Sequence, residues 1–143
     1  MTNFTTRMIF RAAILVVAAG AASAQTLKAE IPFKFWAGST VMAPGSYRVT
    51  AISMLSGGPA IRLNTADGQH PVLLMPVAEG DPQKTWQAEG NPVLAFECTA
   101  SHCSLATIWT GPFTPAYRMP GRKLGKDEPV RTALIEMHPE KTE

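Results

Sequence analysis

The fold class of this chain is decided by the segment Ala43-Pro44-Gly45-Ser46-Tyr47-Arg48-Val49-Thr50-Ala51-Ile52. Proline presets φ and glycine accepts a positive φ, so the first three residues predict a tight turn. In the residues that follow, Tyr47, Val49 and Ala51 alternate with polar neighbours, which is the period of a strand with one buried face. The segment therefore predicts a turn that leads directly into a half-buried β-strand.

Similar short runs, separated by turn residues, lie on both sides of this segment. The chain has 12 prolines and 11 glycines in 143 residues, and they interrupt the long windows that a long helix needs. Asp67-Gly68 is a typical hairpin turn between two of the runs. We expect strands at residues 29–36, 46–52, 60–64, 69–77, 92–98, 103–110 and 116–120. The sequence thus predicts one all-β domain, a small antiparallel β-barrel or β-sandwich of about seven to eight short strands.

Some segments carry more specific expectations. Pro32 confines the first strand to a sheet edge or a bulge, because proline donates no backbone hydrogen bond. Residues 72–75 are continuously apolar, which is expected of a strand covered on both faces. Residues 78–91 are polar and predict a surface loop, from which Trp86 can fold back onto the domain. Residues 130–137 fit either a closing strand or a helical stripe, and their β-branched content favours the strand.

The start of the chain has the pattern of an export signal. Arg7 and Arg11 form a basic beginning, an apolar run follows, and Ala22-Ser23-Ala24 offers the small residues that a signal peptidase recognises. The apolar run is shorter than the ~20 residues that a membrane-spanning helix needs, so a removable signal is favoured over an anchor. We therefore divide the chain into a signal peptide, residues 1–24, and a single β-domain, residues 25–143, which is expected in the periplasm or outside the cell.

The charge of this domain is balanced overall. The whole chain has 13 lysines and arginines against 11 aspartates and glutamates, and Arg7 and Arg11 leave with the signal. A neutral domain has no overall attraction to nucleic acid, so we expect no nucleic-acid partner. Positive charge is concentrated in one segment, the basic loop, which contains Arg118, Arg122, Lys123, Lys126 and Arg131. Such a loop is either simply solvated or meets an anionic polymer of the cell envelope.

Short motifs of the domain resemble those of a group of bacterial proteins. Ile31-Pro32-Phe33-Lys34-Phe35 is followed by Ala43-Pro44-Gly45-Ser46-Tyr47-Arg48-Val49. This pair resembles the IPFxF and LPAGxYxV motifs of short exported proteins that are plentiful in Acidobacteria, and the likeness continues through residues 104–109. The resemblance implies a small β-barrel or β-sandwich outside the cytoplasm, and no catalytic residues, because the group has no established activity. The chain departs from the group at Cys98 and Cys103.

Cys98 and Cys103 are the only cysteines of the chain, and Thr99-Ala100-Ser101-His102 between them fits a hairpin loop. An even number of cysteines, close in sequence and in an oxidising compartment, favours a disulfide across two strands. A redox pair is less well supported, because the spacing is not CxxC. With His102 the two thiols make three zinc ligands, but ligands this close on one loop fit a tetrahedral site poorly, so no metal site is predicted.

No pattern of catalytic residues stands out. His70, His102 and His138 are the three histidines, and none lies in a GxSxG or HExxH arrangement. We interpret each of them as a surface or strand-edge residue and predict no catalytic residue and no cofactor.

Aromatic residues give the remaining hint of function. Most are expected in the core, but Trp36, Trp86 and Phe113 lie in loops or off the inward faces and are predicted to line the mouth of a pocket for a small apolar ligand. We therefore expect an exported binding or envelope-associated β-module without enzymatic activity. The alternative is a small extracellular hydrolase, or a thiol or metal protein that uses Cys98, Cys103 and His102.

Overall fold

The computed structural model describes residues 25–54, 58–121 and 128–140. The strands in these residues are β1 (Thr26–Ile31), β2 (Phe35–Ala37), β3 (Thr40–Met42), β4 (Gly45–Ser53), β5 (Pro59–Thr65), β6 (Val72–Leu74), β7 (Ala78–Gly80), β8 (Val93–Cys98), β9 (Cys103–Trp109), β10 (Ala116–Arg118), β11 (Arg131–Glu136) and β12 (His138–Pro139). A short helix, α2 (Lys84–Glu89), follows β7. The all-β fold class is confirmed, with more and shorter strands than the sequence predicts.

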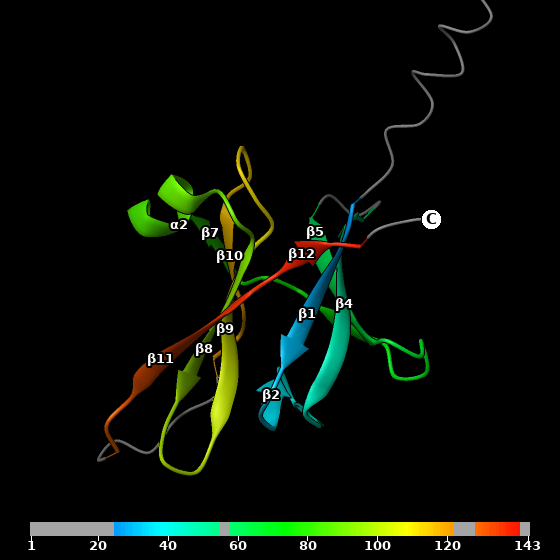
Figure 1. Cartoon of the computed structure of the whole chain (residues 1–143), viewed down its shortest axis with the longest axis vertical. Coiled ribbons are helices and arrows are strands. Elements are labelled where there is room, and N and C mark those ends of the chain that lie inside the picture. The colour runs from blue at the N-terminus through cyan, green and yellow to red at the C-terminus, as the bar shows by residue number, and fades with distance from the viewer. Residues whose placement is uncertain (1–24, 55–57, 122–127, 141–143) are drawn as a thin grey trace, which may run out of the picture.

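The strands form two sheets that stand side by side (Figure 1). The first sheet has five strands in the order β12-β1-β4-β5-β6. The second has seven strands: β11-β8-β9-β10-β7 form one path, and the β2–β3 hairpin joins it where β2 pairs in parallel with β9. Both sheets end in edge strands, so the domain is not closed into a barrel, and the barrel alternative is wrong.

One hydrophobic core is shared by the two sheets. Tyr47 and Val49 of β4 are buried in it, as the alternation of that strand predicts. The ring of Phe35 lies edge-on to Tyr47 of the first sheet at a centroid distance of 5.4 Å, and to Phe96 of the second sheet at 5.3 Å. Aromatic pairs in this geometry contribute roughly 0.5–1.5 kcal/mol each beyond the area they bury. The three rings therefore tie one sheet to the other.

Several strands lie where the sequence places them. β4, β5, β8, β9 and β10 overlap the expected runs, and β5 and β6 form a hairpin around Asp67-Gly68. Residues 131–136 form β11, which pairs with β8 along its whole length, from Arg131 opposite Cys98 to Glu136 opposite Val93. This pairing confirms a strand for most of residues 130–137 and overturns the helical alternative.

Two strand expectations are wrong. The strand expected at residues 29–36 is divided at Pro32, so that β1 ends at Ile31 in the first sheet and β2 begins at Phe35 in the second. The apolar run at residues 72–75 is not covered on both faces, because β6 is the last strand of its sheet and Leu73 is 51% exposed. A continuous apolar run does not distinguish a central strand from an edge strand that meets other apolar groups.

The loop expected at residues 78–91 contains regular structure. β7 pairs with β10, and α2 follows after three residues. Gly90 ends α2 with φ +72°, and its N–H donates to the Trp86 carbonyl oxygen at 2.8 Å. Glycine takes this left-handed conformation without a Cβ clash, so Gly90 is a favourable end for so short a helix.

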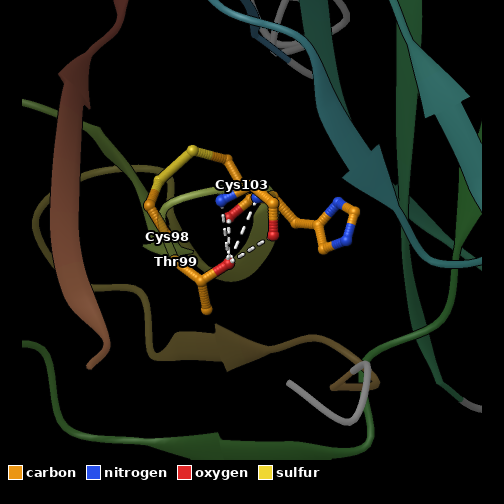
Figure 2. The surroundings of a disulfide bond; sticks show 5 residues. Cys98, Thr99 and Cys103 are labelled. Atoms are coloured by element: carbon orange, nitrogen blue, oxygen red, sulfur yellow. Dashed lines mark hydrogen bonds between the residues drawn. A yellow bond between two sulfur atoms is a disulfide. The ribbon is translucent and has the colours of Figure 1, made fainter. Parts of the chain in front are cut away.

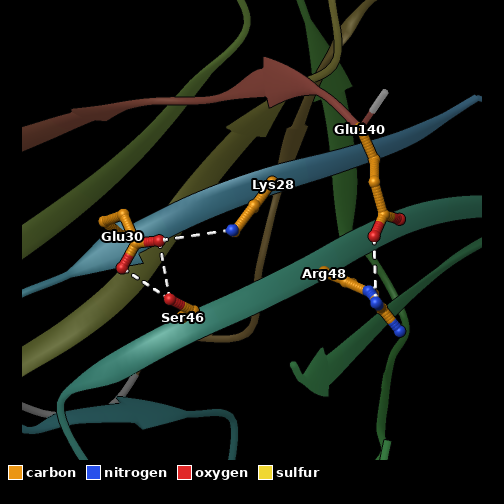
Figure 3. A network of polar contacts seen from close by, with 5 residues as sticks. All are labelled: Lys28, Glu30, Ser46, Arg48 and Glu140. Carbon is orange, nitrogen blue, oxygen red and sulfur yellow. Dashed lines mark hydrogen bonds and ion pairs between the residues drawn. The ribbon is translucent and has the colours of Figure 1, made fainter. Parts of the chain in front are cut away.

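Polar side chains fasten the last described residues to the outer face of the first sheet (Figure 3). Arg48 Nη2 lies 2.9 Å from Glu140 Oε1, and the Ser46 hydroxyl donates to the Glu30 carboxylate at 2.6 Å. Lys28 Nζ lies 3.8 Å from the same carboxylate. Exposed ion pairs contribute only about 0–1 kcal/mol each. These contacts therefore fix the register of β12, β1 and β4 more than they stabilise the domain.

Asp67 organises the turn between β5 and β6. Its Oδ1 accepts hydrogen bonds from the Thr65 hydroxyl and, at 3.0 Å, from the Gln69 backbone N–H. These donors, Thr65 first, hold the pKa of Asp67 below its usual value. A carboxylate with a lowered pKa stabilises the folded state above its unfolded pKa of ~3.9, and this contribution is lost as the pH falls through the folded pKa.

We expect Asp67→Asn to reduce the acid sensitivity of the fold. In the parent protein the free energy of unfolding falls as the pH drops below ~4, because protonated Asp67 accepts these hydrogen bonds poorly. The variant lacks this component and is less stable than the parent at neutral pH. Urea unfolding at neutral and acidic pH measures the difference, with Asp81→Asn as an exposed control. Equal pH dependence of the Asp67 variant and the parent would show that the turn carboxylate does not contribute.

Candidate ligand-binding site

A second cluster of buried side chains lies at the end of β9 that is far from the cysteines. It consists of Trp86, Val93, Ala95, Trp109 and Ala116. Trp86 on α2 stacks on Trp109 of β9, with ring centroids 6.5 Å apart and planes inclined by 28°. One indole ring of a short helix therefore covers this end of the second sheet.

Phe113 is held in solvent by the loop that follows β9. Its side chain is fully exposed and its φ is +69°, in the left-handed region. This region costs a residue other than glycine roughly 1–2 kcal/mol. Thr114 fixes the loop: its hydroxyl donates to the Gly111 carbonyl oxygen at 2.6 Å, and its carbonyl oxygen accepts from the Trp109 indole N–H at 3.1 Å. The surrounding hydrogen bonds thus maintain a conformation that phenylalanine does not favour.

Two hollows border the start of α2. The first, of about 360 Å³, is lined by Pro82, Gln87, Trp109, Pro112, Phe113 and Thr114. The second, of about 330 Å³, is more polar, and its lining includes Glu79, Asp81, Gln83, Trp86, Thr107 and Arg118. We call the residues that line these two hollows the aromatic corner. Because Pro82 lies between Asp81 and Gln83 in the chain, one stretch of backbone borders both hollows.

The polar hollow has an unused hydrogen-bond donor in its wall. Trp86 is only 5% exposed, and its indole N–H has no hydrogen-bond acceptor in the described part of the chain. A buried donor without an acceptor costs about 1–3 kcal/mol. In the same hollow, Glu79 and Asp81 supply carboxylates and Arg118 a guanidinium group. Tyr117 lies outside this lining and packs against the main core, where burial, and next the charge of Glu79, raises its pKa. The corner therefore combines flat apolar walls with carboxylate acceptors and side-chain donors.

Two of the three aromatic residues predicted at a ligand rim belong to the aromatic corner, each on a different hollow. Trp86 stacks on Trp109, and Phe113 lines the first hollow with Trp109, but Trp86 is buried and forms a wall rather than a rim. Trp36 is half-buried in β2 and pairs with Ser104, near the opposite end of β9. Trp36 therefore lies outside the aromatic corner.

The basic loop is described only at its ends. Arg118 in β10 lines the polar hollow, and Arg131 begins β11 opposite Cys98. Arg122, Lys123 and Lys126 lie outside the described residues. The two described arginines thus lie near opposite ends of β9.

Cys98 and Cys103 are joined by a disulfide at the tip of the β8–β9 hairpin (Figure 2). The two residues are direct cross-strand partners, and the Thr99 N–H donates to the His102 carbonyl oxygen at 2.7 Å. The Thr99 hydroxyl oxygen accepts from the His102 N–H at 3.2 Å. Both sulfur atoms and the loop backbone are therefore used to close the hairpin, as the disulfide prediction requires.

Breaking the disulfide is expected to weaken the hairpin without unfolding the domain. A bond that closes so small a loop restricts the unfolded chain by about 2 kcal/mol in the chain-entropy account. The double variant Cys98→Ala/Cys103→Ala should lose that much free energy of unfolding, measured by urea denaturation beside the oxidised parent. The reduced parent is the matched control and should lose a similar amount. An unchanged midpoint, or a variant that does not fold, would contradict the expectation.

The three histidines lie apart from the aromatic corner and from one another. His70 is in the β5–β6 connection, His102 in the disulfide loop and His138 in β12, and all three are exposed. Among residues 25–54, 58–121 and 128–140, no three His, Cys, Asp or Glu side chains gather as metal ligands. The histidines therefore do not identify a site.

Sequence reasoning missed Trp109 and the prolines of the corner. In the sequence, Trp109 has the pattern of an ordinary inward residue at the end of a strand. Its contact with Trp86 depends on the position of α2, which was not predicted from the sequence. The usable signals were Pro82 before the helix, Gly90 after it, and Gly111-Pro112 before an apolar ring in a turn. These signals predict a short helix and an ordered loop. That the helix and the loop lie next to each other follows only from the sheet order.

Comparisons of the chain with protein-family models, with curated proteins and with solved structures find no match. In the described ranges, no helix is long and apolar enough to cross a membrane.

Proposed function

We propose that the chain is an exported, non-enzymatic binding module that uses the aromatic corner as its contact surface. The observation that carries this proposal is Phe113, a fully exposed ring held in a left-handed backbone conformation. Glycine at this position would relieve the strain, and an exposed ring adds nothing to the core, so stability does not account for the residue. Backbone strain of this kind is concentrated where proteins contact ligands. Phe113 therefore serves as the anchor for a ligand.

The chemistry of the corner favours a neutral saccharide over a purely apolar ligand. The ring of Phe113 and the prolines beside it offer flat walls, and the negative face of an aromatic ring attracts the C–H groups of a sugar. In the adjacent hollow the Glu79 and Asp81 carboxylates accept hydrogen bonds from hydroxyl groups, and Arg118 donates them. The same carboxylates would repel an anionic polymer, so this second partner is disfavoured at the corner.

Export and the sandwich architecture are parts of the same proposal. Export rests on the leader pattern in residues 1–24, which lie outside the described residues, and on the resemblance to exported bacterial proteins. The Cys98–Cys103 disulfide is consistent with an oxidising compartment, and two sheets around one core favour a sandwich. The mass of the protein recovered from producing cells tests export: a chain that begins at Gln25 supports it, and one that retains Met1 contradicts it.

An NMR titration of the exported protein tests the binding function. The probes are neutral oligosaccharides of β-linked glucose and of N-acetylglucosamine, and a polyanionic glycan is the control. We expect saturable shifts confined to the signals of Phe113, Trp86, Trp109 and their neighbours. Shifts elsewhere, or none with any neutral sugar, would contradict the proposed ligand. Cleavage of the oligosaccharide into shorter products would contradict the non-enzymatic role.

A further inference from the structure

The two sheets leave an open side between β6 and β3. β6 is the last strand of the first sheet and pairs only with β5, and in the described residues β3 pairs only with β2. Both strands line the same two hollows, of about 550 Å³ and about 570 Å³. Thr40 and Val72 line both hollows, so these form one depression beside the two edges. We call this depression, with its lining residues 37–43, 71–75, 120 and 121 and Tyr47, Thr65, Gln69 and His70, the edge groove.

The edge groove offers both kinds of contact that an added strand uses. Along a free edge strand such as β6, alternate backbone N–H and C=O groups point away from the sheet and have no strand partner. Apolar side chains are exposed beside them: Val41 is 41% exposed, Leu73 51% and Met75 47%. An extended peptide pairs with the backbone groups and places alternate side chains against these residues.

The charge of the groove defines its occupant. Its described lining contains no aspartate, glutamate, lysine or arginine. The hollow at the opposite edge of the same sheet differs, because it is lined by Lys28, Glu30, Glu136, His138, Pro139 and Glu140. A charged side chain pressed into the edge groove would lose its water without gaining an ion pair, which is costly. The groove is therefore complementary to an uncharged segment.

The prolines around β6 argue against a second copy of this chain as the occupant. Pro71 and Pro76 border the strand and donate no N–H, so pairing outside the sheet is limited to residues 72–75. Any added strand therefore forms only a few hydrogen bonds here, and the side chains that fill the two hollows decide which occupant fits. Two β6 edges paired about a twofold axis would leave the hollows unfilled, whereas a separate extended segment can fill them with its own side chains. Flanking prolines of this kind also protect natural edge strands from pairing with one another.

From these observations we propose that the edge groove binds an extended, uncharged apolar segment of a partner protein, which adds to β6 as a further strand. The segment contributes backbone hydrogen bonds to β6 and apolar side chains to the two hollows. This contact is independent of the aromatic corner, because Phe113 and α2 contribute nothing to the lining of the groove.

The test uses a blocked hexapeptide of alternating valine and threonine. We expect saturable binding to the parent protein, together with slowed hydrogen exchange of the backbone amides in residues 72–75. The same peptide with N-methyl groups on alternate residues cannot form the ladder and should not bind. Leu73→Lys should weaken binding about tenfold or more, because it places a charge in the groove. Leu134→Lys is the matched control, since Leu134 is 50% exposed on β11, an edge strand of the other sheet.

Three results would overturn the proposal. Equal binding of the N-methylated peptide would show an apolar pocket without strand addition. A concentration-dependent dimer that Leu73→Lys abolishes, without peptide binding, would show that the edge serves a second copy. If no binding is detected up to the solubility limit of the peptide, the edge groove is not a peptide-binding site. Phe113→Gly serves as a further control, because it changes the aromatic corner and leaves the edge groove intact. Peptide binding should persist in this variant, so that failure of saccharide binding and failure of peptide binding can be told apart.

Discussion

Replacing Trp109 by alanine is expected to lower the free energy of unfolding by about 4 kcal/mol, within the range for large aromatic residues in cores. Trp109 is 1% exposed, stacks on Trp86 and donates its indole N–H to the Thr114 carbonyl oxygen. The variant leaves a cavity under α2 and removes the hydrogen bond that fixes the Phe113 loop. Both losses act on the same end of the second sheet.

Urea denaturation followed by circular dichroism measures this effect. Leu134→Ala, on a half-exposed side chain in β11, is the control and should change the free energy of unfolding far less. The Trp109 variant should also narrow the dispersion of the NMR signals of residues 110–114. A loss below about 1 kcal/mol would mean that the second cluster does not hold α2 in place.

Phe113→Gly is expected to separate stability from binding. Glycine adopts φ +69° without a Cβ clash, so the variant should gain about 0.5–1 kcal/mol after the loss of backbone entropy in glycine is included. Removal of the ring should weaken oligosaccharide binding by about tenfold or more, since ring contacts of this kind contribute on the order of 1 kcal/mol beyond buried area.

The control for this variant is Phe113→Tyr, which keeps a ring and the strain. It should bind nearly as well as the parent and should not gain stability. If Phe113→Gly is less stable than the parent, the loop is not strained in the way that its φ indicates. If Phe113→Tyr loses binding as fully as the glycine variant, ring stacking is not the contact that matters.

The core strands could be predicted because local pattern and tertiary environment agree in them. In β4 the inward positions Tyr47 and Val49 are buried between the sheets. The alternation of apolar and polar residues in the sequence therefore matches the alternation of buried and exposed side chains in the strand. The β8–β9 hairpin was equally predictable from the sequence, because the spacing of Cys98 and Cys103 fits their positions opposite each other at its tip. For these elements, knowledge of the sheet order adds little.

The remaining features depend on contacts between distant segments. The apolar run at residues 72–75 predicts burial, but β6 has a neighbour on only one side. Trp86 folds back onto the domain as expected, but α2 places its ring on Trp109 as a buried wall and not at a rim. The exposure of Phe113 follows from hydrogen bonds of Thr114 to Gly111 and Trp109, which the order of residues does not reveal. Sequence patterns therefore pointed to three residues of the corner, Trp86, Phe113 and Arg118, but not to its shape.

The most direct test of the aromatic corner is isothermal titration of a neutral β-linked oligosaccharide into the parent and into Phe113→Gly. The oligosaccharide is the one that produces the largest shifts in the NMR titration. The predicted result is saturable binding by the parent and a loss of about tenfold or more in the variant, whose midpoint of urea unfolding is equal or higher. Equal affinities of the two folded proteins would contradict the account, because the strained and exposed ring would then contribute nothing to binding.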